Sequence, residues 1–188
     1  MADQLDFFES SPSWPEGFQY GRDLITREDE ERLLQQIREL PFKEFEFHGF
    51  LGKRRTVSFG KSYDFAEEKL RPADDMPAFL LALQQKAATF AHLPAEQLTQ
   101  VLVTEYGANT GIGWHRDKGV FGDVVGISLL SSCRFRLRRK TGKQWERVSV
   151  VLEPRSAYLL RGPVRTEWEH SIPEVDAPRY SVTYRTVR

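Results

Sequence analysis

Histidine and aspartate side chains at one point in the chain have the types and spacing of metal ligands. His115 and Asp117 are two residues apart in the segment Trp-His-Arg-Asp. If this segment is extended, both side chains point to the same side and can meet at one point. His170, further along, is the natural third ligand. Two histidines and one carboxylate suit non-haem Fe(II), because they occupy one face of its octahedron and leave the opposite positions open.

The His-x-Asp pair is weak support when it is taken alone. Such pairs often arise by chance, and a lone histidine is more commonly an ordinary hydrogen-bonded residue than a ligand. The metal hypothesis therefore depends on a second feature elsewhere in the chain.

That second feature is the alternation of residues near the C-terminus. Tyr180, Val182 and Tyr184 share one strand parity, and the other parity is polar. The polar side chains are Arg179, Ser181, Thr183 and Arg185. An ordinary amphipathic strand with its polar face in water would show the same pattern. Inside a barrel, however, two guanidinium groups facing a metal need an anion, and a small dicarboxylate such as 2-oxoglutarate offers matching bidentate geometry.

The order of these residues resembles the AlkB family of 2-oxoglutarate- and Fe(II)-dependent dioxygenases. The family motif His-x-Asp … His … Arg-x-Asn-x-Thr-x-Arg is matched by His115, Asp117, His170, Arg179, Thr183 and Arg185. This match is colinear over residues 100–188. A looser similarity lies upstream, where residues 53–60 and Tyr63 resemble the arginine-rich lead into the nucleotide-recognition region of the family.

The resemblance implies a fold, cofactors and residue roles. The fold would be a double-stranded β-helix, or jelly roll, with Fe(II) at its mouth, and 2-oxoglutarate and O2 would be cosubstrates. Arg179 would pair with the distal carboxylate of 2-oxoglutarate, and Arg185 would serve the end near the metal. Tyr106 occupies the place of a cosubstrate-binding tyrosine, although it could equally be a packed strand aromatic. Ser181 and Thr183 complete the cosubstrate motif.

Three positions depart from the family pattern. Ser181 and Thr104 stand where the family has asparagines, and both can still donate and accept hydrogen bonds. Gly119 stands where the DNA-repair prototype has an acidic residue that helps to read the damaged base. The resemblance therefore supports the cofactors more firmly than the substrate.

The usual chemistry of the family predicts oxidative demethylation of N-methylated bases in DNA or RNA, as in alkylation-damage repair. We expect a single-stranded substrate, because a base must leave the stack before it can react. The candidate substrate residues are Lys53, Arg54 and Arg55 for phosphates, and Phe59, Tyr63 and Trp114 for stacking on a base. The alternatives are the same chemistry on a protein or small molecule, and a non-catalytic jelly-roll binding module.

A further run of basic residues could contact phosphates. It extends from Arg134 to Lys140 and includes Lys143 and Arg147. Attraction to phosphates supplies much of nucleic-acid affinity, but charged strand faces are also common on solvated sheets. Both interpretations stay open from the sequence.

Two helices are expected in the first half of the chain. Thr26 can cap a helix in which Leu33, Leu34 and Ile37 recur at helical spacing, and Pro41 ends it. A second helix is expected from about Pro77 to Ala91, with leucines at 80, 81 and 83. The first helix should cover a sheet, the second should have a structural role, and residues 1–25 should form an irregular arm.

From about residue 99 the sequence favours short strands. They are expected at residues 100–106, 124–130, 133–138, 145–152, 157–160 and 180–187. Cys133, Phe135 and Leu137 alternate with arginines, and Thr141-Gly142 suits a hairpin turn. The predicted class is α+β, mainly β, with a jelly-roll core supported by N-terminal helices.

Length and composition agree with one domain over residues 1–188, divided into an N-terminal part (1–98) and a jelly-roll core (99–188). Lysine plus arginine and aspartate plus glutamate both total 27, so nucleic acid would need a local basic patch. Cys133 is the only cysteine, which fits a reducing cytoplasm. No run of apolar residues is long enough for a membrane span, and we expect a monomer.

Overall fold

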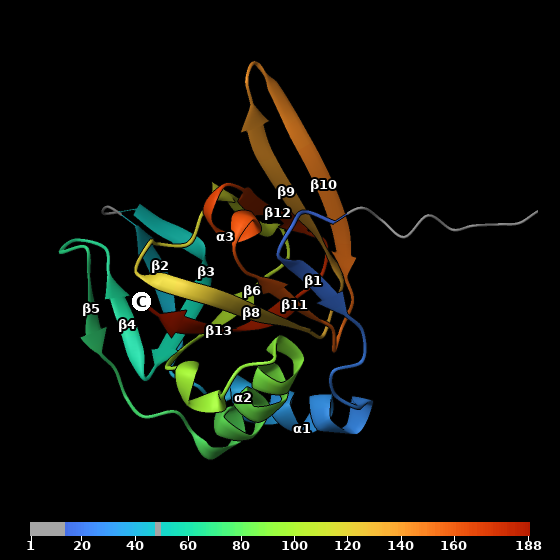
Figure 1. Cartoon of the computed structure of the whole chain (residues 1–188). Helices are drawn as coiled ribbons and strands as arrows, with labels where there is room; N and C mark the ends of the chain where they lie inside the picture. The colour runs from blue at the N-terminus through green and yellow to red at the C-terminus, as the bar shows by residue number, and fades with distance from the viewer. Residues whose placement is uncertain (1–13, 48–49) are drawn as a thin grey trace, which may run out of the picture.

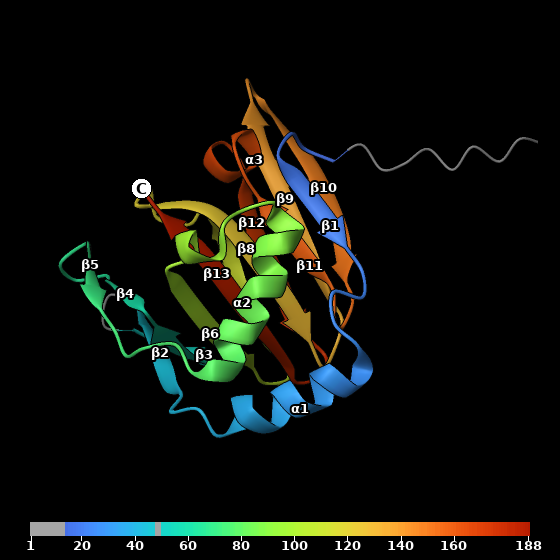
Figure 2. The ribbon, with the colours of Figure 1, turned by 60° about the horizontal axis from the view of Figure 1, so that its bottom comes forward.

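Two antiparallel sheets face each other in the computed structural model, which describes residues 14–47 and 50–188 (Figure 1). The larger sheet has the strand order β1-β11-β8-β13-β6-β3-β2, and the smaller one has the order β10-β9-β12-β7. A separate hairpin, β4-β5, lies beside them. Two helices cover the outer face of the larger sheet, as Figure 2 shows for α2.

The helices are α1 (Arg27–Arg38), α2 (Ala78–Ala91), the 3-10 helix η1 (Ala95–Gln97) and α3 (Pro163–Thr166). The strands before η1 are β1 (Phe18–Gly21), β2 (Lys43–Phe47), β3 (Phe50–Phe59), β4 (Lys61–Asp64) and β5 (Lys69–Pro72). The strands after η1 are β6 (Gln100–Tyr106), β7 (Thr110–His115), β8 (Phe121–Leu129), β9 (Cys133–Thr141), β10 (Gln144–Leu152), β11 (Ala157–Leu160), β12 (Glu169–Val175) and β13 (Arg179–Val187).

The path of the chain from β6 to β13 makes this core a jelly roll. Successive strands alternate between the two sheets, and the β9–β10 hairpin is the single place where two consecutive strands share the smaller sheet. The predicted fold class, mainly β with supporting helices, is confirmed. The polar face of β13, the C-terminal end of β7 and the N-terminal end of β12 then face the space between the two sheets. A site can be enclosed there.

The two predicted helices form where the sequence indicated. Thr26 caps α1 through a capping box with Asp29, and Leu33, Leu34 and Ile37 are buried against the sheet. The second helix, α2, begins directly after Pro77 and buries Leu80 and Leu83. Leu81 departs from the expected packing, because it lies on the solvent side and is 45% exposed. These helices and the outer face of the larger sheet enclose one hydrophobic core.

The N-terminal part contributes more strands than we expected. β1 lies in the predicted irregular arm and pairs with β11, while β3 pairs with β6, so strands from before residue 99 extend the larger sheet at both edges. Residues 1–13 of the predicted arm lie outside the described residues. The N-terminal part therefore supplies strands of the larger sheet itself, and not only the helices that cover it.

Two strands of the smaller sheet were not predicted. β7 contains Gly111 and Gly113, and β12 contains Pro173, residues that are depleted in strands. The pairing of β12 with β7 has register shifts on both sides of Ile172. Tertiary pairing overrides weak local propensity here, and these are the strands that carry the two candidate metal histidines.

The predicted alternation on β9 is confirmed. Cys133, Phe135 and Leu137 are buried in a second core between the sheets, and the arginines alternate with them on the outer face. The hairpin turn lies at the expected place, with Gly142 at a φ of +60°. The β9–β10 hairpin projects well beyond the sheets at the top of Figure 1.

Candidate metal and cosubstrate site

The structure brings the three predicted metal ligands together. His115 ends β7 and is the cross-strand partner of His170 on β12, and their ring centroids are 4.3 Å apart. The Asp117 Oδ2 atom lies 3.7 Å from His170 Nε2. All three side chains meet at the end of the space between the two sheets.

Asp117 reaches this point by a different route from the predicted one. The strand ends at His115, so Asp117 lies in the connection to β8 rather than two residues along an extended strand. Its Oδ1 accepts a hydrogen bond from Arg185 Nε at 2.8 Å, and Arg185 Nη2 lies 2.8 Å from the same oxygen. In the described part of the chain, no three His, Cys, Asp or Glu side chains are arranged to hold a metal ion as they stand.

The chemistry of the donor set nevertheless fits Fe(II). His115 Nδ1 lies 2.8 Å from the carbonyl oxygen of Gly113, a partner that fixes the ring and leaves Nε2 for a metal. Donation of the second ring N–H to a backbone carbonyl is the usual support for a ligating histidine. One carboxylate and two imidazoles are also the set that leaves open positions on Fe(II).

The electrostatics keep these groups in the protonation states that a metal needs. Burial lowers the pKa of His170 to about 3, and the charge of His115 acts in the same direction. Burial likewise lowers the pKa of His115. Burial alone would raise the pKa of Asp117, but the charge of the neighbouring Arg185 guanidinium holds that pKa well below its usual range. Two neutral imidazoles and one carboxylate are therefore present at neutral pH.

Arg179 has the surroundings of an anion-binding residue. Its side chain is 1% exposed, and its guanidinium group lies 5.0 Å from the ring centroid of Tyr106. Its Nε donates to Ser128 Oγ at 3.1 Å, while its buried Nη1 has no hydrogen-bond partner in the part of the chain that the structure describes. A buried cation with an unsatisfied donor is costly unless a ligand completes it. A carboxylate of 2-oxoglutarate fits that requirement.

The polar face of β13 is buried and does not meet water. Ser181 and Thr183 are buried beside Arg179, and Arg185 is half-buried at the far end. Arg185 Nη1 also donates to Gln100 Oε1 at 3.0 Å. In this structure Arg185 therefore positions Asp117 directly, beside the metal candidates.

The run Lys53-Arg54-Arg55 does not form one surface, because successive side chains on β3 alternate between the two faces. Lys53 lies 3.9 Å from Glu174, and Arg55 is paired with Glu105 at 2.6 Å. Arg54 is half-buried on the other face, where it interacts electrostatically with Tyr106. Of the three, Arg54 is the residue that faces the site.

Two candidate stacking residues are placed away from the site, and both predictions are corrected here. Phe59 is 5% exposed and packs in the core beneath the helices, because it has the opposite strand parity to Arg54. Trp114 precedes His115 and therefore points to the outer face of the smaller sheet, where Arg138 lies 4.3 Å from its ring centroid. Neither ring can flank a base beside the metal candidates.

Tyr63 does lie near the Asp117 connection, together with residues that we did not assign to the site. Its ring contacts Phe65 at 5.0 Å and Phe121 at 6.2 Å between centroids. The Lys118 Nζ atom lies 5.4 Å from the Tyr63 ring centroid and 5.5 Å from that of Phe65. The signal for Lys118 was its position directly after Asp117.

A second residue that sequence reasoning missed is Arg165 of α3. It is buried and donates to the carbonyl oxygens of Lys118, Phe121 and Gly122, so it fixes the connection that carries Asp117. Nothing in the local sequence indicates this role, since α3 is only four residues long and approaches β8 through tertiary packing.

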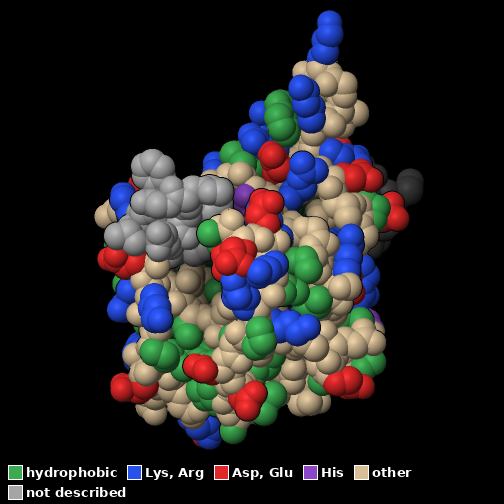
Figure 3. All heavy atoms as spheres, turned by 90° about the vertical axis from the view of Figure 1, so that its left-hand side faces the viewer, with side chains coloured by type: hydrophobic (Ala, Val, Ile, Leu, Met, Phe, Trp, Pro, Cys, Tyr) green, Lys and Arg blue, Asp and Glu red, His purple; other side chains and the backbone are tan. Residues whose placement is uncertain are grey.

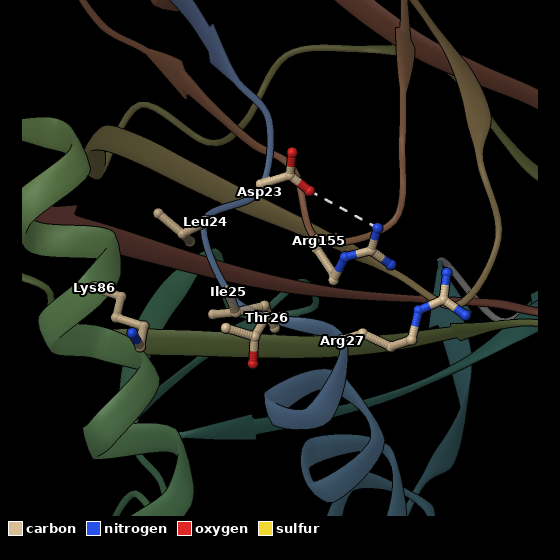
Figure 4. Close-up of a pocket in the computed structure, with 7 residues that line it drawn as sticks. All are labelled: Asp23, Leu24, Ile25, Thr26, Arg27, Lys86 and Arg155. Carbon is tan, nitrogen blue, oxygen red and sulfur yellow. Dashed lines mark ion pairs between the residues drawn. The ribbon is translucent and has the colours of Figure 1, made fainter.

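A surface hollow of about 360 Å³ lies elsewhere, between the connection from β1 to α1 and helix α2 (Figure 4). It is lined by Asp23, Leu24, Ile25, Thr26, Arg27, Lys86 and Arg155. None of the candidate site residues lines it, and its Asp23–Arg155 ion pair of 3.8 Å joins only surface segments. It is therefore not part of the metal and cosubstrate site.

The chain is similar to known proteins of one superfamily. The model of the 2OG-Fe(II) oxygenase superfamily matches residues 9–186. The chain is 24% identical over 164 residues to the "Alkylated DNA repair protein ALKBH8 homolog" of Arabidopsis thaliana, covering 73% of this chain and 47% of that protein. It thus spans about half the length of that relative.

Two further matches cover almost the whole chain. The "Uncharacterized protein L905" of Acanthamoeba polyphaga mimivirus is 23% identical over 194 residues, which covers 91% of this chain and 85% of that protein. The solved structure titled "The structure of OsALKBH1" superposes with a TM-score of 0.67 at 15% identity, covering 90% of this chain and 96% of that one. The similarity to the OsALKBH1 structure shows a shared fold.

Proposed function

We propose, from the premise that this chain belongs to the 2OG-Fe(II) oxygenase superfamily, that it demethylates N-methylated bases in DNA or RNA. The protein is an AlkB-like, 2-oxoglutarate-dependent non-haem iron dioxygenase, and it uses Fe(II) with 2-oxoglutarate and O2 as cosubstrates. The residue roles and the methylated-base substrate are our proposals.

Two observations carry the residue assignment: His115, Asp117 and His170 converge, and the buried Arg179 Nη1 has no hydrogen-bond partner among the described residues. We infer that these three side chains hold Fe(II). Arg179 receives the distal carboxylate of 2-oxoglutarate, and Arg185 holds Asp117 in place. Tyr106, Ser181 and Thr183 line the cosubstrate side of the same buried face.

When bound, Fe(II) would supply the oxidising chemistry by which O2 and 2-oxoglutarate hydroxylate a C–H bond. Succinate and CO2 are the other products. On an N-methyl group, the hydroxymethyl product breaks its C–N bond and releases formaldehyde. The residues of this chain orient and shield that step. The two sheets exclude water around His170 and Arg179, which strengthens the electrostatic interactions there.

A base as substrate is supported by the aromatic group beside the Asp117 connection. Tyr63, Phe65 and Phe121 lie together there, and Lys118 adds a cation over two of the rings. Aromatic rings bind a base by stacking, and a cation attracts the adjoining phosphate. The name of the Arabidopsis relative, which refers to alkylated DNA repair, agrees with this proposal.

The direct test offers 1-methyladenine and 3-methylcytosine in single- and double-stranded oligonucleotides and measures formaldehyde. We expect turnover, with the single strand preferred because it avoids most of the unstacking cost. A panel of methylated peptides and small molecules runs in parallel. Turnover of that panel alone, by a preparation that makes succinate, would reject nucleic acid as the substrate.

A companion variant tests the basic residues of β3. Replacing Lys53, Arg54 and Arg55 by alanine should weaken use of the oligonucleotide at every salt concentration, mainly through Arg54. A matched triple alanine variant of Arg22, Arg27 and Lys86, which are exposed on the far side near α1, should act as wild type. Equal activity of both triple variants would remove the β3 surface from the proposal.

We further propose that residues 1–188 act as a single domain and as a monomer in the cytoplasm. The single cysteine, Cys133, is buried, which fits a reducing compartment. Among the described helices, none has the length and apolar character that would be needed to span a bilayer.

A further inference from the structure

The outer face of the projecting β9–β10 hairpin carries an aromatic and cationic surface that the site does not use. Arg138 on β9 lies between two tryptophans, with 4.3 Å from its guanidinium carbon to the ring centroid of Trp114 on β7 and 4.3 Å to that of Trp145 on β10. Arg136 adds a second contact to Trp114 at 4.9 Å. Trp145 is 38% exposed, so its ring has an accessible surface.

Cations surround this stack without matching carboxylates. Lys140, Lys143 and Arg147 are exposed along the hairpin, and none of them forms an ion pair with any described residue. Arg147 is the cross-strand partner of Arg138, but only Arg138 has a carboxylate partner, Glu169, among the described residues. Lys and Arg side chains are seen on the projection at the top of Figure 3. An external polyanion would supply the opposite charge to Lys140, Lys143 and Arg147.

The surface lies directly behind the candidate metal ligands. Trp114 precedes His115, and Glu169, whose Oε2 accepts from Arg138 Nε at 2.6 Å, precedes His170. Side chains alternate along both strands, so the histidines face inward and their neighbours face the hairpin surface. β7 is one of the two edge strands of the smaller sheet, so the surface reaches that sheet edge.

We propose that this hairpin surface, defined by Trp114, Arg138, Lys140, Lys143, Trp145 and Arg147, docks a single-stranded nucleic acid outside the reacting base. The inference deepens the proposed function and rests on it. The exposed indole of Trp145 stacks on a base, and the three unpaired cations meet phosphates. A nucleic-acid strand held there reaches the site around the edge of β7. The surface contacts nucleotides other than the reacting base, so binding to it does not depend on methylation.

The test measures binding of a fluorescent, unmethylated dT12 oligonucleotide to the full chain over a range of salt concentrations. Trp145→Ala should weaken binding by roughly 5-fold or more, the loss expected for one stacked base. The triple variant Lys140→Ala, Lys143→Ala, Arg147→Ala should lower the slope of log Kd against log salt by about 2. The controls are Leu81→Ala, another exposed apolar residue, and the triple alanine variant of Arg22, Arg27 and Lys86.

Unchanged dT12 binding in both hairpin variants would overturn the proposal. So would Trp145-dependent binding of poly-glutamate as tight as that of dT12, because the surface would then be one for acidic polypeptides. Succinate release without prime substrate should stay at the wild-type rate in both hairpin variants. A parallel loss of succinate release and of binding would also overturn the proposal, because the substitutions would then act through the fold.

The outcomes separate docking from chemistry. If the hairpin variants lose dT12 binding while wild-type protein demethylates no methylated base, the docking surface stands and the proposed substrate chemistry fails. If wild-type protein demethylates 3-methylcytosine in an oligonucleotide and the hairpin variants do so with the same KM, the chemistry stands and the docking surface fails.

Discussion

Side-chain chemistry at the site depends on groups that are buried before any ligand arrives. His170 and Arg179 are almost completely enclosed, and Asp117 is held by Arg185. Burial keeps the imidazoles neutral, whereas the neighbouring guanidinium keeps the carboxylate charged. This combination is what a divalent metal and an anionic cosubstrate need. Substitution of the metal ligands and of Arg179 should therefore have different effects.

The first prediction concerns the metal ligands. His115→Ala, Asp117→Ala and His170→Ala should each reduce Fe(II)-dependent succinate release to background, because losing any ligand leaves the metal poorly held and badly oriented. The control is His92→Asn, a change to an exposed histidine at the end of α2, where asparagine tolerates the left-handed backbone. Succinate release retained in two of the three variants would reject the assignment.

The second prediction concerns the cosubstrate. Arg179→Leu should weaken 2-oxoglutarate binding by at least about 30-fold, since the other charge of a buried pair is left without a partner. Thermal unfolding with and without 2-oxoglutarate provides the measurement: ligand should stabilise the wild type but not the variant. The variant should fold without ligand, because it removes a buried donor that has no partner within residues 14–47 and 50–188. An equal ligand-induced shift in both proteins would place the carboxylate elsewhere.

At the scale of elements, β7 decides whether the two histidines can meet. It is an edge strand with two glycines, and its pairing with β12 is irregular. Gly111 lies close against the partner strand: a Cβ there would be 2.5 Å from the carbonyl oxygen of Ile172. Gly113 has open space around the same position. The same substitution at the two glycines therefore compares a crowded position with an open one on the same strand.

The third prediction uses this pair. Gly111→Ala should lower the free energy of unfolding by about 1–3 kcal/mol, because the backbone of β12 must move to accept the methyl group. It should also reduce Fe(II)-dependent turnover, since that movement separates His170 from His115. Gly113→Ala keeps the carbonyl that contacts His115 and should change both quantities little. Urea denaturation and succinate release check the result, and equal behaviour of the two variants would contradict it.

Another element ties the site to the helices. The Tyr184 hydroxyl of β13 donates to the carbonyl oxygen of Leu80 in α2 at 2.6 Å, deep in the core. Tyr180, Val182 and Tyr184 thus anchor one face of β13 to the helix layer, while Arg179 and its polar neighbours face the other sheet. The helices support the strand that carries the cosubstrate residues.

At the scale of the whole molecule, burial of the site between the two sheets makes the stability of the fold depend on pH. The site lies between the sheets, so its histidines are withdrawn from water in the folded state and exposed in the unfolded state. The folded pKa of His170, about 3, lies far below its usual value of 6.5. As pH falls below 6.5 the unfolded chain takes up a proton that the folded chain does not, and stability is lost.

The fourth prediction follows from this linkage. The unfolding free energy of the metal-free protein should fall by about 1.4 kcal/mol per pH unit from the His170 contribution between pH 6.5 and 4. The lowered pKa of His115 acts in the same direction. Urea denaturation in the presence of a chelator at pH 7.5, 6.5 and 5.5 provides the measurement. A His170→Gln variant should show a shallower dependence on pH, and an unchanged slope would contradict the prediction.

The sequence by itself determined the chemistry and much of the local structure. The donor types of His115, Asp117 and His170, the paired arginines of β13 and the helix signals at Thr26 and Pro77 are local properties that can be read from residue type and spacing. The resemblance to the AlkB family depended on those same residues. Strong periodicity explains why both helices and the apolar strands of the core were predicted correctly.

Tertiary structure alone decided which residues face the site. β7 and β12 contain glycine and proline, so their pairing, and the meeting of His115 with His170, depends on long-range contacts. Strand parity, fixed by sheet order, turned Phe59 into the helix-side core and Trp114 to the outer face. Packing of segments distant in sequence brought Arg165 to the Asp117 connection and placed the Tyr63 ring beside Lys118. A sequence lists side chains along one dimension, whereas burial and facing are properties of the assembled sheets.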